Sequence, residues 1–305
     1  MPIDVLHSTL RADCAQGTLP SVEADGLIRL ARGCWLPASA SDDLLARCRA
    51  VVDTSAENSV IVDVTAARIH GLWLPRDSDE IHVATAEPGR PSCEVTRTRR
   101  PQIRAHRRKL TEIDVVEVNG VPVASLARTW VDLAATFVLP DVVAAGDSAL
   151  RSGASREDLA DAVRRSSKLK GVRLARLALP LLNVRSRSRA ESHLRVAASA
   201  PDLPAFQVNE PIYRDEGGWL AEPDLSLLEA KIALEYQGSD HAELARMRKD
   251  ITRATDMRSD GWLVLEYGPT QVFGRPWHIA PELRSWVRER APHLLHPRPR
   301  RRVDS

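Results

Sequence analysis

Long apolar runs are missing from this sequence of 305 residues, and so is the apolar core of an export signal near its N-terminus. A membrane-spanning helix requires about 20 consecutive apolar residues, and no stretch of the chain provides them. The first residues, MPIDVLHSTLRAD, mix charged and apolar side chains and lack the centre of a secretory leader. We therefore expect a cytoplasmic protein with no membrane partner.

Cysteine is scarce and its spacing has no pattern. The four cysteines, Cys14, Cys34, Cys48 and Cys93, form neither a CxxC pair nor a disulfide framework, so we expect ordinary reduced thiols. Internal repeats are also missing, and the only biased tract is a basic Pro/Arg tail after Pro297.

Positive charge is small in total but uneven along the chain. The formal net charge is only +2, which by itself does not indicate a polyanionic partner. Three basic runs stand out: Arg97, Arg99, Arg100, Arg104, Arg107, Arg108 and Lys109; Arg164, Arg165, Lys168, Lys170, Arg173 and Arg176; Arg298, Arg300, Arg301 and Arg302. Any one run is equally consistent with a solvated face, but three together favour a phosphate backbone, and we expect DNA as the partner.

The length exceeds what one small core fills, and the alternation of periods predicts an α/β protein (α+β overall) with several domains. We place a winged-helix-like region at residues 1–60 and a mixed α/β, then helical, region at 61–184. An α/β domain with a mixed central sheet follows at 185–290, with the polar segment Arg185-Ser-Arg-Ser-Arg189 at its boundary, and a basic tail occupies 291–305.

The N-terminal part contains a clear hairpin pattern and a run of strands. Residues 26–37 form two alternating segments around Gly33, which predicts a two-stranded wing. Helices are expected from Asp42 and Asp43 through residue 52 and again over 62–70. Strands are then expected near residues 81–85, 93–97, 103–107, 115–118 and 121–123, with Asn119-Gly120 as a tight turn. Helices follow from Ser125 to about residue 184.

The C-terminal part contains the residues with the strongest chemical pattern. The expected order is a helix at 190–198, strands at 205–213, 219–225 and 231–237, a helix at 242–258, a strand at 262–267 and a helix at 281–289. Alternation puts Glu235 on one face of its strand, and a short connection brings Asp224, at the end of the preceding strand, beside it. Two carboxylates in one place suit a hard divalent ion, and we expect Mg²⁺ or Mn²⁺.

Pro223-Asp224 followed eleven positions on by Glu235-Tyr236-Gln237 resembles the PD-(D/E)xK nuclease superfamily. The further pattern of Gly238, His241, Asp250, Arg253 and Gly261-Trp262 resembles its Vsr-like group, domain of unknown function 559 (DUF559). The resemblance implies a restriction-endonuclease-like fold with Asp224 and Glu235 as metal ligands and Glu191 as an accessory ligand.

The same resemblance assigns His241 to the scissile phosphate and Gln237 to the catalytic set. Gln237 stands where the superfamily has Lys, and Gln neither accepts a proton nor supplies positive charge at neutral pH. Arg253 is a candidate phosphate contact, with Arg104, Arg107 and Arg108 from the first basic run. A second interpretation of Glu191 is an ion pair with Arg195 at i,i+4.

Residues of the N-terminal two thirds resemble the AbiEi-type antitoxin or transcriptional-regulator family. The segments that carry the resemblance are residues 26–37, 63–73, 120–134 and 147–151. It implies a DNA-binding winged helix, here shortened, followed by a mixed α/β domain and a cognate toxin as partner.

Two functions follow from these patterns. The first is a DNA-interacting protein whose C-terminal domain hydrolyses phosphodiester bonds with a metal ion. The alternative is a non-catalytic DNA-binding regulator or antitoxin of a type IV toxin–antitoxin system, in which a degenerate nuclease fold serves as a binding platform. Gln237 favours the regulator, whereas Asp224 and Glu235 favour the enzyme.

Overall fold

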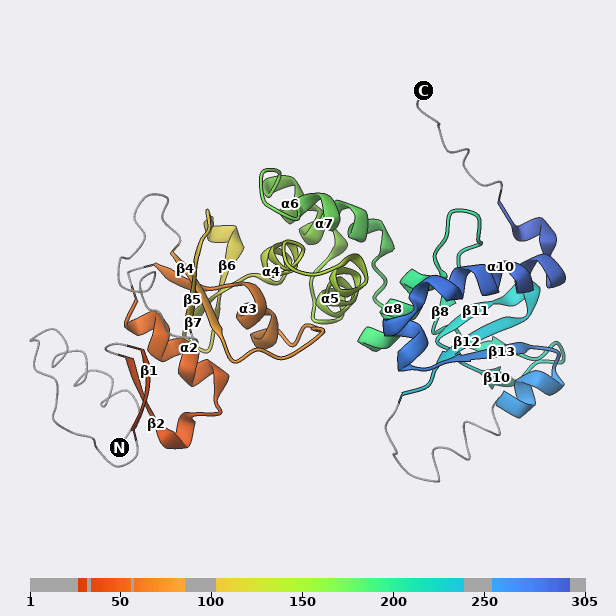
Figure 1. Ribbon diagram of the computed structural model, residues 1–305, viewed down its shortest axis with the longest axis horizontal. Coiled ribbons are helices and arrows are strands. Elements are labelled where there is room, and N and C mark those ends of the chain that lie inside the picture. The colour runs from red at the N-terminus through yellow and green to blue at the C-terminus, as the bar shows by residue number, and fades with distance from the viewer. Residues whose placement is uncertain (1–26, 32–33, 56–57, 86–102, 239–253, 297–305) are drawn as a thin grey trace, which may run out of the picture. The chain divides into compact units, whose positions relative to one another are not determined.

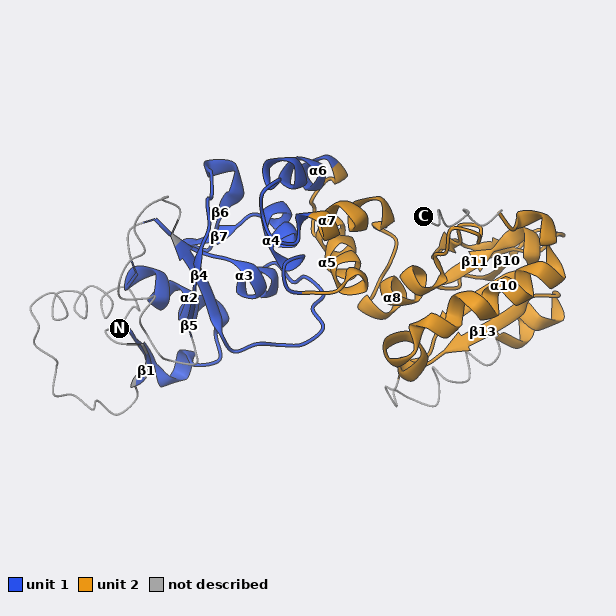
Figure 2. Ribbon diagram, turned by 45° about the horizontal axis from the view of Figure 1, so that its top comes forward, with its two compact units in different colours: residues 1–136, 157–172 blue, residues 137–156, 173–305 orange. Residues whose placement is uncertain are grey.

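The computed structural model describes residues 27–31, 34–55, 58–85, 103–238 and 254–296 (Figure 1). The chain divides into two compact units, one made of residues 1–136 and 157–172 and the other of residues 137–156 and 173–305 (Figure 2). Each unit contains sheets and helices, which confirms the mixed α/β class. No helix in the described ranges has the length and apolar character needed to cross a membrane.

A five-stranded sheet in the order β5-β4-β3-β7-β6 forms the centre of the first unit. Its strands are β3 (Ser59–Ile61), β4 (Ile81–Thr85), β5 (Ile103–Arg107), β6 (Val115–Val118) and β7 (Val121–Ala124). Pairs β3/β7 and β4/β5 are parallel, whereas β3/β4 and β6/β7 are antiparallel. The strands predicted near 81, 103, 115 and 121 are therefore confirmed, and the one predicted at 93–97 lies outside the described residues.

Local chemistry explains how these elements begin and turn. Asn119 (φ 49°) and Gly120 (φ 77°) both have positive φ, as the tight turn between β6 and β7 requires. The Asp43 side chain accepts hydrogen bonds from the Leu45 and Ala46 amides and so caps α2 (Leu44–Asp53). Ser125 caps α4 (Leu126–Leu133) in the same way.

The first unit contains several further short elements. They are α3 (Asp63–Ile69), most of α6 (Arg156–Arg165), the short 3-10 turns η1 (Ala38–Ala40) and η2 (Glu112–Asp114), and a hairpin of β1 (Leu27–Ala31) and β2 (Cys34–Pro37). The predicted wing is thus a real antiparallel hairpin. Its core joins β2, α2 and the sheet through residues such as Leu36, Cys48, Ile61 and Ile81.

A four-stranded sheet in the order β13-β12-β11-β8 forms the centre of the second unit. The strands are β8 (Gln207–Val208), β11 (Leu225–Leu227), β12 (Ile232–Tyr236) and β13 (Leu263–Tyr267). Neighbours are antiparallel except for β12 and β13, which are parallel. A separate hairpin pairs β9 (Ile212–Tyr213) with β10 (Trp219–Ala221).

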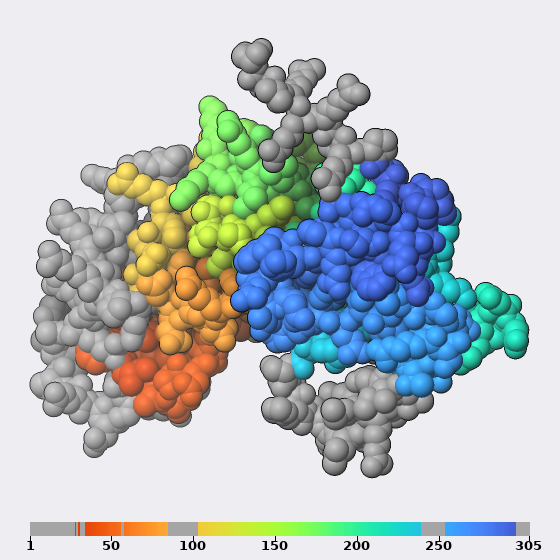
Figure 3. All heavy atoms as spheres, turned by 45° about the vertical axis from the view of Figure 1, so that its right-hand side comes forward, coloured from red at the N-terminus to blue at the C-terminus, as the bar shows by residue number. Residues whose placement is uncertain are grey.

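Helices and short turns complete this unit. They are α5 (Leu139–Arg151), α7 (Val172–Ala178), η3 (Leu179–Leu181), α8 (Arg189–Ala198), η4 (Leu228–Ala230), the π turn η5 (Thr270–Gly274), η6 (Pro276–His278), α10 (Ile279–Arg290) and η7 (Pro292–Leu294). Residues 254–259 are also helical. In Figure 3 the blue surface, which belongs to residues 254–296, forms an outer face of this unit.

Both faces of the second sheet are covered by apolar residues. Leu194, Leu234 and Leu283 belong to the cluster that α8 and α10 share with the sheet. Ala233 and Met257 belong to a smaller cluster with the β9–β10 hairpin. The β9–β10 hairpin therefore packs against the face of the sheet opposite α8 and α10.

Two predicted strands are interrupted. The strand expected at 205–213 breaks into β8 and β9 because Asn209 has φ 47°, a left-handed conformation that ends the ladder. The strand expected at 219–225 breaks around Pro223, so that β10 joins the small hairpin and β11 joins the main sheet. The domain limits at 60, 184 and 290 stay predictions; the compact units group α5 with α8 instead, because these two helices pack together.

Candidate functional site

Asp224 and Glu235 lie beside each other in the second unit. The antiparallel register pairs Leu225 with Leu234, and Asp224 and Glu235 are the next positions on their strands. The Tyr236 amide donates a hydrogen bond of 2.7 Å to Asp224 Oδ2, which fixes the direction of this carboxylate. The structure thus brings together the two acids that the sequence predicted. Asp224 stands just before the first residue of β11 and not, as expected, at the end of a strand.

Glu235 is buried and has a second acidic residue beside it on the neighbouring strand. Its residue is only 8% exposed, and its register partner in the parallel strand β13 is Glu266. Glu266 accepts a hydrogen bond of 3.3 Å from Arg258 Nη2 at the surface. Acidic groups on adjacent strands raise the local negative charge, a condition that favours a cation.

The Glu191 carboxylate accepts hydrogen bonds at the start of helix α8. Its Oε2 atom accepts hydrogen bonds from the Arg187 amide (2.7 Å) and from Asn209 Nδ2 (2.8 Å), while its own amide donates to Ser188 Oγ. The carboxylate therefore links the helix start to the residue that ends β8. Because the Asn209 amide also donates to the Asp224 carbonyl oxygen, Glu191 is connected to the acid pair through Asn209.

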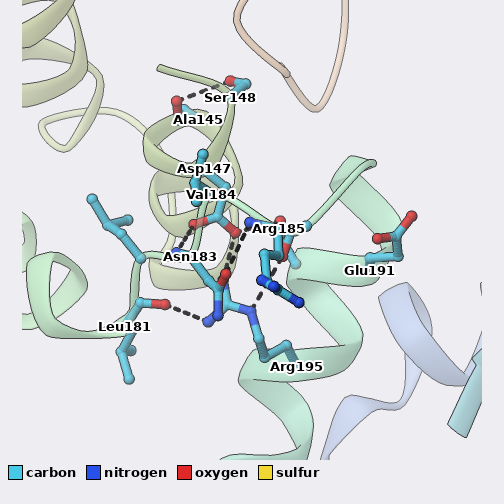
Figure 4. Close-up of polar contacts among 12 residues, drawn as sticks. Ala145, Asp147, Ser148, Leu181, Asn183, Val184, Arg185, Glu191 and Arg195 are labelled. Carbon is cyan, nitrogen blue, oxygen red and sulfur yellow. Dashed lines mark hydrogen bonds and ion pairs between the residues drawn. The ribbon is translucent and has the colours of Figure 1, made fainter. Parts of the chain in front are cut away.

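The second interpretation of Glu191, an ion pair with Arg195, is wrong. Figure 4 shows Glu191 pointing away from Arg195, whose guanidinium lies against Asp147 of α5. Arg195 also donates to the Leu181 carbonyl oxygen and to Ser186 Oγ, so its donors are directed into the interior.

Asp147 is the centre of a buried polar network that positions α8. It is fully buried and accepts hydrogen bonds from Ser192 Oγ (2.6 Å), the Asn183 amide (2.6 Å) and Arg195. Burial raises the pKa of the Asp147 carboxyl, and the neighbouring Arg195 opposes that rise. The network ties α8, and with it Glu191, to α5.

Of the other predicted residues of this site, Gln237 lies within the described part of the chain and two lie outside it. Gln237 is exposed, and its backbone N–H donates to the Tyr267 carbonyl oxygen (2.9 Å). His241 and Arg253 lie outside the described residues, so their predicted contacts stay predictions.

Three arginines on or just after β5 were predicted to contact phosphates. Two of them are exposed, and the third lies close to buried acids. Arg104 and Arg107 are exposed, although Arg104 Nη2 contacts Glu80 Oε1 at 3.1 Å. Arg108 lies close to two buried acids, Asp63 (3.4 Å) and Asp132 (3.6 Å). Its guanidinium is therefore directed toward these acids, and the phosphate contacts predicted for the three arginines stay predictions.

The sequence patterns missed a cluster of ligand-type side chains in the first unit. Asp63, His82 and His106 place one ligand atom each within 4.8 Å of the others, and among the described residues this is the one such group of three. Glu191, Asp224 and Glu235 do not meet that criterion. Each of the expected strands at 81–85 and 103–107 contains a histidine, which is the one sequence feature that pointed to this cluster. Neither segment by itself shows that the two strands are neighbours in the sheet.

Part of the chain is similar to a known protein family. Residues 59–183 match the family model of the AbiEi antitoxin C-terminal domain. The AbiEi-like segment begins with β3, includes the whole five-stranded sheet and ends just before α8. The predicted likeness of residues 185–290 to PD-(D/E)xK nucleases lies outside this match and stays a prediction.

Two uncharacterized proteins of Mycobacterium tuberculosis, from strains CDC 1551 / Oshkosh and ATCC 25618 / H37Rv, are similar to most of the chain. Each is 27% identical over 264 residues, which cover 85% of this chain and 92% of the relative. The similarity therefore extends beyond the AbiEi-like segment. No solved structure was found to match the chain.

Proposed function

We propose that this protein is a regulator of the antitoxin type, which binds DNA and a cognate toxin and does not hydrolyse its partners. The observation that carries the proposal is the match of residues 59–183 to the AbiEi antitoxin C-terminal domain. A toxin–antitoxin pair requires a protein partner, so the proposal names a toxin protein as the second ligand.

The C-terminal unit supports a binding function better than hydrolysis. Gln237, at the place where a nuclease needs a base or a cation, is exposed and supplies neither. Glu191, the proposed accessory ligand, already accepts two hydrogen bonds through Oε2 at the start of α8.

DNA binding rests on exposed cations. Arg104 and Arg107 on β5, and Lys168 and Lys170 after α6, are exposed within the first unit. Phosphate contacts by such side chains are independent of base sequence and weaken as salt rises, because binding releases counterions. A specific operator would require base contacts in addition.

Two measurements test the regulator. Fluorescence anisotropy with a labelled duplex of the promoter DNA upstream of its own gene should show binding that weakens steeply with salt. Co-expression with the product of the adjacent gene should relieve growth arrest caused by that product. Salt-independent anisotropy would contradict the DNA contacts, and growth arrest that persists with soluble protein present would contradict the antitoxin function.

A second candidate function is a metal-dependent nuclease, and the alignment of Asp224 with Glu235 favours it. Two neighbouring carboxylates, one oriented by a backbone amide, suit a hard cation such as Mg²⁺ or Mn²⁺. Asp224 and Glu235 would hold this ion, which would supply charge neutralisation at a phosphate and an activated water. Gln237 would orient that water through its amide.

Supercoiled plasmid distinguishes the two candidates. Wild-type protein is incubated with Mg²⁺, Mn²⁺ or EDTA beside Asp224→Asn and Glu235→Gln, which keep side-chain size but remove charge. Metal-dependent nicking that both variants lose supports the nuclease. DNA retention by all three proteins without nicking supports the regulator.

A further inference from the structure

Helix α3 and strands β4 and β5 of the first unit each contribute one side chain to a cluster of ligand-type groups. Asp63 is the first residue of α3 and lies two positions after the end of β3, while His82 lies on β4 and His106 on β5. His82 is directly across from Arg104, so His106, two positions further along β5, projects on the same side of the sheet. The two imidazole rings stack with centroids 4.9 Å apart.

The ring nitrogens that face each other are His82 Nδ1 and His106 Nε2, at 3.0 Å. Two nitrogens bound to one tetrahedral zinc ion at 2.0–2.1 Å stand about 3.3 Å apart. The observed separation is within a few tenths of an ångström of this value, and a rotation of the rings that turns both lone pairs toward one point makes the two nitrogens a pair of metal ligands.

An independent observation comes from Asp63. The residue is 3% exposed, and its Oδ1 atom is buried without a hydrogen-bond partner. The other oxygen, Oδ2, lies 3.4 Å from Arg108 Nη2. Since a buried carboxylate oxygen without a partner is costly, Oδ1 is a vacant acceptor next to two imidazoles.

Glu80 provides the outer contact that a histidine ligand usually has. Its Oε2 atom lies 3.5 Å from His82 Nε2, on the side of the ring opposite Nδ1. An acceptor at Nε2 holds the proton there and leaves the Nδ1 lone pair directed to His106 and Asp63. Thr65 strengthens the frame, because its hydroxyl donates to the Glu80 carbonyl oxygen and accepts from the His82 amide.

We propose that Asp63, His82 and His106 bind one divalent transition-metal ion of the Zn²⁺ class, with Glu80 orienting His82. Imidazole nitrogens select Zn²⁺, Co²⁺ or Ni²⁺ over Mg²⁺, which prefers oxygen ligands. Three protein ligands leave one position for water or an external ligand.

The charges around the site are compatible with a cation. Asp63, Glu80 and the nearby Asp132 contribute negative charge, and Arg104 and Arg108 contribute positive charge. The site is separate from the acid pair at Asp224 and Glu235, which belongs to the other unit.

The test uses the full chain, stripped with EDTA and titrated with Co²⁺ or Zn²⁺. Visible absorption of Co²⁺ reports nitrogen and oxygen coordination, and calorimetry with Zn²⁺ reports stoichiometry and affinity. Asp63→Asn keeps size and tolerates the positive φ of 56° at this position, and His106→Gln removes one ring. Glu80→Gln tests the outer contact, and His278→Gln, an exposed histidine of the other unit, is the control.

We expect one ion per wild-type chain, unchanged affinity in His278→Gln, and an affinity about 10- to 100-fold lower in Glu80→Gln. Asp63→Asn and His106→Gln should lose the absorption band. Asp132→Asn, which alters the buried network without removing a ligand, should keep it, and circular dichroism verifies that each variant is folded. Wild-type protein without the band, or a band that survives in folded Asp63→Asn or His106→Gln, overturns the proposal.

Discussion

Asp147 on α5 accepts a hydrogen bond of 2.6 Å from Ser192 on α8, and Arg195, one turn further along α8, pairs with the same carboxylate. Removing Asp147 leaves the guanidinium of Arg195 buried without its counter-charge. We expect Asp147→Ala to lower the free energy of unfolding by about 3–5 kcal/mol, measured by urea denaturation. Arg258→Ala, which removes an exposed partner of Glu266, should cost less than about 1 kcal/mol.

Replacing both Asp147 and Arg195 measures how much their ion pair contributes to the free energy of unfolding. Burial raises the pKa of Asp147 despite its partners, which indicates that desolvation offsets much of the attraction. The double variant Asp147→Leu/Arg195→Met should therefore be within about 2 kcal/mol of wild type, far from the sum of the single changes. Additive losses would mean that Asp147 and Arg195 are not coupled, and would contradict the explanation that the unpaired charge sets the cost of each single change.

Gly171 should tolerate substitution less well than Gly153, although both have positive φ, 85° and 104°. A Cβ atom at Gly171 would overlap the backbone at Ala134 and Ala135, whereas one at Gly153 would meet open space. We expect Gly153→Ala to cost about 1 kcal/mol from backbone strain. Gly171→Ala should cost about 2 kcal/mol more, because packed backbone must move. Thermal unfolding measures both, and equal losses would contradict the overlap.

Cys34 and Cys48 should resist thiol reagents in the folded protein. Both are fully buried, and burial raises the pKa of the Cys48 thiol to about 12. Since the thiolate is the reactive form, little of it exists at pH 8. Iodoacetamide labelling followed by peptide mass spectrometry should leave both unmodified in the native state and modify both in urea. Rapid native labelling of Cys48 would contradict its burial.

Several helices and turns were predictable from the sequence, because residues close in the chain determine where they begin and turn. Asn119-Gly120 predicted a hairpin from two residues that adopt positive φ, and Asp43 predicted the start of α2 as a cap. The neighbourhood of Asp224 and Glu235 was also predictable, since a short connection joins their strands. Asn209, by contrast, breaks a strand through a left-handed conformation that its sequence segment does not specify.

Long-range contacts were not predictable from those patterns. The partner of Arg195 is Asp147, 48 positions earlier in the chain, so an i,i+4 argument chose the wrong acid. The cluster of Asp63, His82 and His106 depends on β4 and β5 being adjacent and parallel, which is a property of the whole sheet. Arg108 belongs to a basic run in the sequence, yet its position next to Asp63 and Asp132 turns it inward.

The difference between Arg107 and Arg108 leads to the last prediction. If exposed cations on β5 contact phosphates, Arg107→Ala should weaken DNA binding and reduce the slope of log affinity against log salt by about 1. Arg108→Ala should instead lower thermal stability, because Asp63 and Asp132 lose a buried counter-charge. Anisotropy across a salt series, with melting curves of the same samples, separates the two effects. The contradicting result is a smaller slope of log affinity against log salt in folded Arg108→Ala and an unchanged slope in Arg107→Ala. It would mean that Arg108, and not Arg107, contacts phosphate.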